Sequence, residues 1–407
     1  MCSLKMNCRI CIVLISEYIM QKGSVSLLYL VVFFTVVNCE KPTDNTLLVD
    51  VNATPETVAL YKNLKQLSGE HSLFGHQATL AYGRTWMGDS SRSDVKDVTG
   101  SFPALYGWDV ADFLPDPRLN EQQNDQKRKK SLDFAKEGLA RGGVLTYAWH
   151  MRNPVTGRSF YDTTRAVSAI LPGGEKHQQY KHTLDEVAAY FRELSPMPVI
   201  FRPFHEHNGD WFWWGKGLCT EEEYRALWRF TFNYLVNEKE VHNLIWAFSP
   251  DRSRTNIHTF KRDYFYGYPG DNFVDIIGLD NYWDVGHPAN TASPPVRAEQ
   301  FIKSLTMTSE IADSLGKITA LTETGLEAIP DSTFWTKTLL KGMLANASTQ
   351  KMVYVQVWRN ANYEREQRDH YYAPFPGQVS APDFIKFRNT EFVLFEDELP
   401  DLYSIDR

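Results

Sequence analysis

Eight short apolar runs separated by longer amphipathic stretches most constrain the fold of this chain. The runs are rich in β-branched and aromatic residues. They cover residues 73–77, 104–109, 144–150, 198–202, 244–249, 274–279, 318–322 and 353–357. Continuous apolar strands that alternate with helices indicate a parallel sheet buried on both faces.

Helical patterns fill the intervals between the runs. They cover residues 126–141, 183–194, 221–237, 296–315 and 332–344. The clearest is the pattern at 221–237, where Thr220 and Glu223 form a capping box ahead of an apolar stripe. Eight strand–helix units over about 360 residues fit a closed (β/α)8 barrel. A doubly wound sheet is less suitable, because no Gly-rich phosphate loop follows the first run. We therefore predict a single barrel domain over residues 46–407.

The first 39 residues are predicted to be a targeting segment. The apolar run at 25–37 follows Lys22 and is shorter than the roughly 20 residues that span a bilayer, so it fits a signal peptide. A signal that starts at Met20 would have conventional proportions. Residues 35–39 resemble a bacterial lipoprotein signal, in which Cys39 becomes the lipidated first residue. We expect export to the cell envelope or secretion, with residues 40–45 as a linker and Cys39 as the only membrane anchor.

The cysteine content argues against disulfide bonds, and the net charge limits the kinds of molecule that the protein is expected to bind. Of the five cysteines, only Cys219 would remain in the exported protein, so no intramolecular disulfide can form. Cys219 is expected to be a packed, unreactive thiol. The formal net charge is -7 and no long basic run occurs, which argues against a nucleic-acid partner. A neutral polymer and a monomeric protein are expected.

Polar residues follow the predicted strands at their carboxyl ends. The sets lie at 76–77, 108–109, 149–150, 205–206, 249–251, 280–283, 323–325 and 358–360. Catalytic groups of (β/α)8 barrels lie at this end of the strands. Two of these residues are glutamates: Glu206 follows the fourth strand and Glu323 the seventh. We expect the two side chains to face each other across the mouth of the barrel.

The segment at 201–215 combines a carboxylate with aromatic residues. Glu206 is followed by four aromatic residues in succession, Trp211 to Trp214. Sugars present flat C–H faces that stack on indole rings, while their hydroxyl groups need polar partners. Carbohydrate chemistry is therefore expected. Two carboxyl groups about 5 to 5.5 Å apart suit double displacement, which retains the anomeric configuration.

Two motifs carry a resemblance to a known family. Residues 202–215, with 322–325 downstream, resemble glycoside hydrolase family 26, the β-mannanase family of the retaining barrel clan. Further similar segments lie at 149–154, 170–174, 268–271 and 278–282. The similarity covers residues from about 70 to 360.

This resemblance implies roles for individual residues. Glu206 would be the acid/base and Glu323 the nucleophile. Tyr282 would donate a hydrogen bond to the nucleophile, and Asp280 would lie near the acid/base. The remaining implied sugar-binding residues are His150, His205, Trp211, Trp358 and Arg359, the last on the sugar next to the attacked one.

Other residues near these motifs have simpler interpretations. Arg202 is expected to support Glu206 through an indirect contact, with Asn208 as a second supporting residue. Trp213 and Trp214 are expected to pack beneath the loop rather than touch sugar. Glu327 is expected at the surface.

A metal site is a competing interpretation of the histidines. His76, His150, His205 and His207 could in principle bind a metal. However, the segment around Glu206 lacks the second histidine at i+4 that a zinc-protease helix requires, and Pro203 does not fit such a helix. The sequence predicts neither a metal nor another cofactor.

The predicted function is hydrolysis of internal β-1,4-mannosidic bonds in mannan, glucomannan or galactomannan. The same two glutamates could act on β-1,3-xylan or mixed-linkage β-glucan, because loops set the specificity. An exo-acting mannobiohydrolase is a further alternative to endo action, and the loops at 155–182 and 284–295 are the candidate determinants of this choice. A non-catalytic glycan-binding protein is the alternative from another class. The presence of both glutamates argues against it.

Overall fold

A computed structural model describes residues 48–404 of the chain. The predicted signal segment, the start at Met20, the lipid site Cys39 and the linker 40–45 lie outside these residues. Among the described helices, none has both the length and the apolar character needed to cross a membrane.

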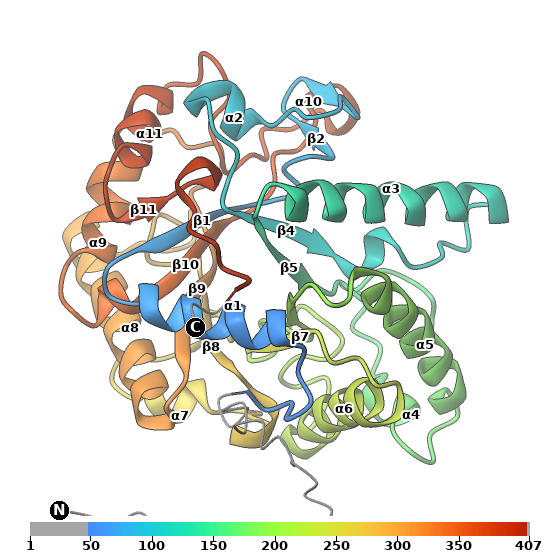
Figure 1. Ribbon diagram of the computed structural model, residues 1–407. Coiled ribbons are helices and arrows are strands. Elements are labelled where there is room, and N and C mark those ends of the chain that lie inside the picture. Colours follow the sequence, from blue (N-terminus) through green and yellow to red (C-terminus); the bar gives the residue numbers. More distant parts are fainter. Residues whose placement is uncertain (1–47, 405–407) are drawn as a thin grey trace, which may run out of the picture. The chain divides into compact units, whose positions relative to one another are not determined.

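Eight parallel strands close into a barrel (Figure 1). The strands are β1 (Ser72–Gln77), β4 (Leu105–Asp109), β5 (Val144–Ala148), β6 (Val199–Arg202), β7 (Leu244–Phe248), β8 (Ile276–Asn281), β9 (Ile318–Thr324) and β10 (Met352–Val357). Each strand pairs with the next along this series, and β10 pairs with β1 to complete the ring. The predicted (β/α)8 barrel is confirmed, and each predicted strand lies within two residues of an observed one at either end.

The helices between the strands form the outer layer. The principal ones are α3 (Glu121–Ala140), α5 (His177–Leu194), α6 (Glu221–Asn233) and α8 (Pro294–Leu315). The Thr220 capping box at the start of α6 is present. Two predicted helices are partly π-helical: α6 continues as a π-helix over Tyr234–Glu238, and a π-helix over Phe334–Leu340 precedes α9 (Lys341–Met343).

Shorter elements complete the described chain. They are α2 (Asp94–Thr99), α4 (Val167–Ile170), α7 (Phe260–Tyr264), α10 (Tyr363–Glu366), α11 (Ala381–Arg388), β2 (Tyr82–Gly83), β3 (Trp86–Met87), β11 (Val393–Leu394) and 3-10 turns at Val110–Asp112, Arg252–Arg254, Asp271–Phe273, Thr349–Lys351 and Glu396–Glu398. The hairpin β2–β3 is joined to the segment after β10, because Asn362 donates to the backbone carbonyls of Gly83 and Trp86.

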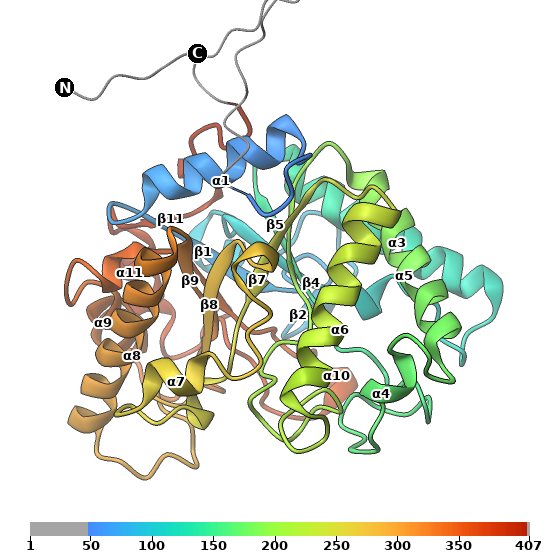
Figure 2. The ribbon, with the colours of Figure 1, turned by 90° about the horizontal axis from the view of Figure 1, so that it is seen from below.

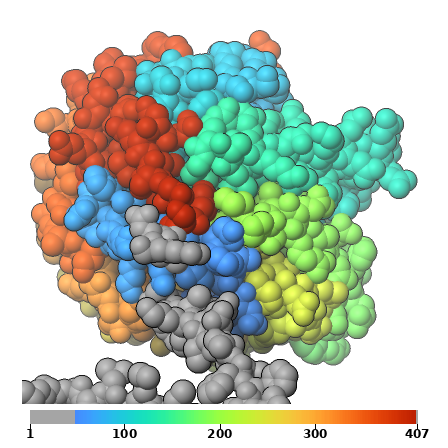
Figure 3. Space-filling view, viewed as in Figure 1, coloured from blue at the N-terminus to red at the C-terminus, as the bar shows by residue number. Residues whose placement is uncertain are grey.

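Helix α1 (Pro55–Leu67) closes the amino-terminal end of the barrel (Figure 2). Its Leu60 and Leu64 are fully buried in one cluster with side chains from the strands. Asn63 on α1 donates to the carbonyl of Leu402, and Figure 3 shows α1 beside the carboxyl-terminal residues on this face. Because this end is covered, substrate access is restricted to the carboxyl ends of the strands.

Cys219 is the free cysteine among the described residues, and it is buried. Its thiol donates to the carbonyl of Trp214 at 3.3 Å. Burial raises the pKa of Cys219 to about 12, so the reactive thiolate is not populated near neutral pH. The expectation of a packed thiol is confirmed.

Candidate active site

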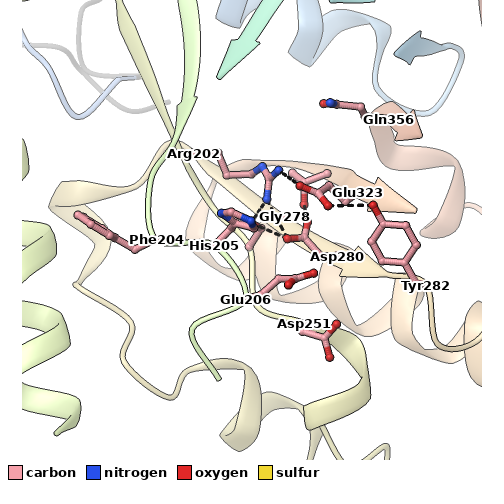
Figure 4. Close-up of polar contacts among 12 residues, drawn as sticks. Arg202, Phe204, His205, Glu206, Asp251, Gly278, Asp280, Tyr282, Glu323 and Gln356 are labelled. Carbon is pink, nitrogen blue, oxygen red and sulfur yellow. Dashed lines mark hydrogen bonds and ion pairs between the residues drawn. The ribbon is translucent and has the colours of Figure 1, made fainter. Parts of the chain in front are cut away.

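The two predicted glutamates meet at the carboxyl ends of the strands (Figure 4). Glu323 lies within β9, whereas Glu206 lies beyond β6 in a backbone turn with φ of 52°. The amide of Glu206 donates to the carbonyl of Ser249 at 2.9 Å and ties this turn to the end of β7. Glu206, Asp280 and Glu323 each place a carboxylate oxygen within 4.8 Å of the other two.

Arg202 contacts the carboxylates beside Glu206 rather than Glu206 itself, in keeping with the indirect contact that the sequence predicted. Its guanidinium donates to Asp280 at 2.8 Å and forms an ion pair with Glu323. It also donates to Ser249 at 3.1 Å and is 1% exposed. Arg202 is the last residue of β6 and its side chain points into the barrel toward β8 and β9. Glu206 lies four residues further on, where the chain has already turned into the mouth.

Donors from two sides hold the carboxylate of Glu323. Arg202 donates to one oxygen, and the hydroxyl of Tyr282 donates to the other at 2.9 Å. Burial raises the pKa of Tyr282 well above its ordinary value, and the negative charge of Glu323 raises it further. Tyr282 therefore keeps its proton and acts as a donor. The carboxylate of Glu323 is oriented toward the cavity as an acceptor with little freedom to rotate.

Asp280 lies beneath the two glutamates and is fully buried. The hydroxyl of Thr322 donates to one of its oxygens at 2.6 Å, and Arg202 donates to the other. Gly278 allows Thr322 this position, because a Cβ there would lie 2.6 Å from Thr322 Cγ2. Asp280 was expected to bind substrate, yet both of its oxygens accept bonds from protein donors. The negative charge of Asp280 raises the pKa of Glu206.

The surroundings of Glu206 favour its protonated form. Burial raises the pKa of Glu206 well above its ordinary value, and the negative charges of Asp251, Glu323 and Asp280 raise it further. The indole of Trp211 donates to its Oε2 at 2.8 Å, which acts in the opposite direction. A carboxylic acid that retains its proton in this position can donate it to a bound substrate.

Most of the predicted sugar-binding residues lie on one cavity of about 590 Å³. His150, His205, Trp211 and Trp358 line it together with both glutamates and Tyr282. Arg359 is not among its lining residues and instead forms an ion pair with Glu366 at 2.6 Å.

Asp109 and the residues around it hold His150 in place. The ring of His150 contacts Asp109 through Nδ1 at 2.5 Å and lies 4.6 Å from the ring of His205. Burial lowers the pKa of His205 well below its ordinary value, and the positive charge of Arg202 lowers it further. The ring of His205 is therefore neutral.

Trp213 and Trp214 pack beneath the cavity as expected. Trp213 and Trp214 are fully buried. Their indole nitrogens donate to the carbonyls of Met151 at 2.8 Å and His205 at 2.9 Å. They fix the loop that carries Glu206.

Several residues of the cavity were not assigned to it from the sequence. They are Tyr161, Phe212, Asp251, Trp283, His287 and Tyr372. Asp251 follows a predicted strand and was recognised only as a polar strand end. Glu327 was expected at the surface, and it is exposed; it also borders the cavity and contacts His370 at 2.6 Å. Asn208 also has a specific contact, because it accepts from the amide of Asp251 and donates to its carbonyl, both at 2.8 Å.

A closed barrel with two glutamates in an aromatic cavity at the strand ends defines a glycoside hydrolase. Comparison with known proteins agrees with this class. The chain belongs to glycosyl hydrolase family 26, whose family model matches residues 49–333.

Curated relatives share part of this chain. It is 37% identical over 287 residues to a mannan endo-1,4-beta-mannosidase of Bifidobacterium adolescentis, which covers 68% of this chain and 27% of the relative. It is 28% identical over 281 residues to the mannan endo-1,4-beta-mannosidase A and B of Caldalkalibacillus mannanilyticus, covering 62% of this chain and 50% of the relative. The chain thus spans half or less of these two relatives.

Solved structures match over almost their full length. A GH26 beta-mannanase from Bacteroides ovatus has a TM-score of 0.75 and 39% identity, covering 87% of this chain and 98% of that chain. GH26C from Muricauda sp. has a TM-score of 0.79 and 34% identity, and the match covers 90% of this chain and 98% of that chain.

Proposed function

We propose that this chain hydrolyses internal β-1,4-mannosidic bonds with retention of anomeric configuration, with Glu323 as nucleophile and Glu206 as acid/base. The observation that carries this proposal is the close approach of the two carboxyl groups, whose oxygens lie within 4.8 Å of each other. Inverting enzymes separate their carboxyl groups by about 6.5 to 9.5 Å to hold a water molecule between them. Direct attack by Glu323 is therefore the better fit.

In the first step, Glu323 attacks the anomeric carbon and forms an ester with the sugar. Glu206 donates its proton to the glycosidic oxygen, and the leaving half of the polymer departs as a neutral alcohol. The raised pKa of Glu206 keeps this proton available. Tyr282 and Arg202 hold the attacking carboxylate in line.

In the second step, the carboxylate of Glu206 removes a proton from water. The resulting hydroxide attacks the same carbon and breaks the ester, which frees Glu323 and restores the proton on Glu206. Two displacements at one carbon retain its configuration.

The residues around the glutamates are proposed to bind the polymer. His150, His205 and Trp358 would surround the attacked sugar, and Trp211 would supply an apolar face beside Glu206. Arg359 would contact the next sugar on the non-reducing side. Its ion pair with Glu366 and the nearby ring of Tyr82, 5.8 Å away, would fix its direction.

The substrate proposal rests on the relatives, which are called mannan endo-1,4-beta-mannosidases. The test is incubation with linear mannan, galactomannan, β-1,3-xylan and barley β-glucan beside a Glu323→Ala control. A ladder of manno-oligosaccharides that is lost in the control supports the proposal, whereas a single early disaccharide indicates exo action. Products from xylan or β-glucan alone would contradict the assignment of mannan as the substrate. Binding of mannan without cleavage would favour the glycan-binding alternative.

We also propose that the chain is exported as a lipid-anchored monomer, on the strength of its amino-terminal sequence. The test is labelling of cells with radioactive palmitate. Label on the wild type that is lost in Cys39→Ala supports the anchor. An unlabelled protein in the culture medium would favour plain secretion.

A further inference from the structure

Asp251 is a third acidic group at the wall of the catalytic cavity. It lies three residues after Phe248, where β7 ends, is 7% exposed and lines the same cavity as Glu206 and Glu323. In Figure 4 it lies next to Glu206, on the side away from Arg202. The mechanism described above does not use it.

The loops that carry Asp251 and Glu206 are fastened to each other. Asn208 binds the backbone of Asp251 through both its amide and its carbonyl, and the amide of Glu206 donates to Ser249. The hydroxyl of Ser253 donates to the carboxylate of Asp251. These bonds fix the backbones that carry the two carboxyl groups, and Ser253 orients the carboxylate of Asp251.

The cations near this cluster are engaged elsewhere. Arg202 pairs with Asp280 and Glu323, and Arg254, on the loop of Asp251, pairs with Asp210 at 2.6 Å. The negative charge of Asp251 raises the pKa of Glu206 and that of Asp280, whose backbone is bridged to that of Asp251. Arg254 is the nearby cation that lowers the pKa of Asp251.

We propose that Asp251 is a positioning residue for the proton donor: its fixed carboxylate disfavours a second negative charge on Glu206 in both steps of catalysis. This inference rests on the proposed function. Burial raises the pKa of Asp251 itself to about 6, so it is charged in the range above pH 6. Glu323 loses its charge when it forms the sugar ester, but Asp251 does not. Asp251 therefore assists the first step, which needs Glu206 as an acid, and opposes the second, which needs it as a base.

The test compares wild type, Asp251→Asn and Asp133→Asn. Asp133→Asn is the control, because it removes an equal charge from an exposed side chain whose ion-pair partner, Lys129, does not line the cavity either. The substrates are mannopentaose, whose leaving group needs a proton, and 2,4-dinitrophenyl β-mannobioside, whose leaving group does not. The measured quantity is kcat/KM between pH 4 and 9, which reports the free enzyme and the first step.

For Asp251→Asn on mannopentaose, we expect the basic limb of the kcat/KM profile to move to lower pH by about one unit. At pH values above this limb, kcat/KM should then be about tenfold lower than in the wild type. On the aryl substrate, kcat/KM should equal that of the wild type, which also shows that the variant is folded. Asp133→Asn should give the wild-type profile on both substrates.

An unmoved basic limb in Asp251→Asn would overturn the inference, as would an equal loss on both substrates at every pH, which indicates a structural role. A wild type inactive on mannopentaose would overturn the proposed function together with this inference. An active wild type with an unmoved limb overturns the inference alone.

Discussion

The indole nitrogen of Trp211 lies 2.8 Å from Oε2 of Glu206 and donates a hydrogen bond to it. A donor to a carboxylate stabilises the charged form, whereas burial and the neighbouring carboxylates stabilise the protonated form. Glu206 is therefore held between opposing influences. In the proposed reaction it must change between acid and base at each turnover, so neither influence can be removed without consequence.

Replacing Trp211 with Phe should move the basic limb of kcat/KM to higher pH. The substitution removes the donor, which raises the pKa of Glu206, and it keeps an aromatic face beside the sugar. The measurement is the pH profile on mannopentaose. Trp358→Phe is the matched control, because Trp358 lines the same cavity without a hydrogen bond to Glu206 among the described contacts. A limb that moves equally in both variants would contradict this account.

Tyr282→Phe should lower kcat with little change in KM. The lost hydrogen bond to Glu323 involves a charged acceptor, for which about 1.5 to 3 kcal/mol is typical, or roughly a ten- to hundredfold loss of rate. Steady-state kinetics on mannopentaose measure this. Tyr372→Phe removes another hydroxyl from the cavity wall, one with no hydrogen bond to Glu323 among the described contacts, and serves for comparison. Equal effects of the two variants would argue against a specific role for Tyr282.

Arg202→Met should reduce the free energy of unfolding by about 3 to 5 kcal/mol, because it leaves two buried carboxylates without their cation. Urea unfolding at pH 7 is the measurement. Adding Asp280→Asn to this variant removes one of the unpaired charges and should recover part of the loss. If Arg202→Met is as stable as the wild type, the ion pairs contribute nothing to folding.

His76 should make the stability depend on pH below neutrality. Burial lowers its pKa from 6.5 to about 3 in the folded protein. The unfolded chain therefore binds a proton at this residue first, so stability is complete above pH 6.5 and declines as the pH falls toward 3. The slope is about 1.4 kcal/mol per pH unit.

His76→Asn should remove this part of the slope between pH 6 and 4 in urea unfolding. His258→Asn, at an exposed histidine, is the control and should keep the wild-type slope. An identical slope in His76→Asn would show that the folded protein protonates His76 without cost.

The barrel was predictable from the sequence because its strands are buried on both faces. Such strands read as uninterrupted apolar runs, and their ends were located within two residues. Helix starts were less accurate: α3 and α5 begin five and six residues before the apolar patterns at 126 and 183, since their first turns are polar. Helix α1 was not predicted, and its role became evident only from its packing across the barrel end.

The position of the two glutamates was predictable, but their partners were not. Strand order places Glu206 and Glu323 at one mouth. The direct partners of Arg202, Asp280 and Glu323, depend on the direction of a side chain at the end of β6, and the sequence predicted only an indirect contact with Glu206. Asp251 is held beside Glu206 by a contact with Asn208, 43 positions away in the chain, and no local sequence pattern predicts this contact.

The identity of the nucleophile is tested most directly by trapping the sugar ester. A 2-deoxy-2-fluoro-β-mannobiosyl fluoride reacts in the first step, but its ester hydrolyses slowly, so peptide mass mapping can locate the adduct. We predict a single mannobiosyl adduct on Glu323 in the wild type and none in Glu323→Ala. An adduct on Glu327 or Asp280, or hydrolysis without any adduct, would contradict the account.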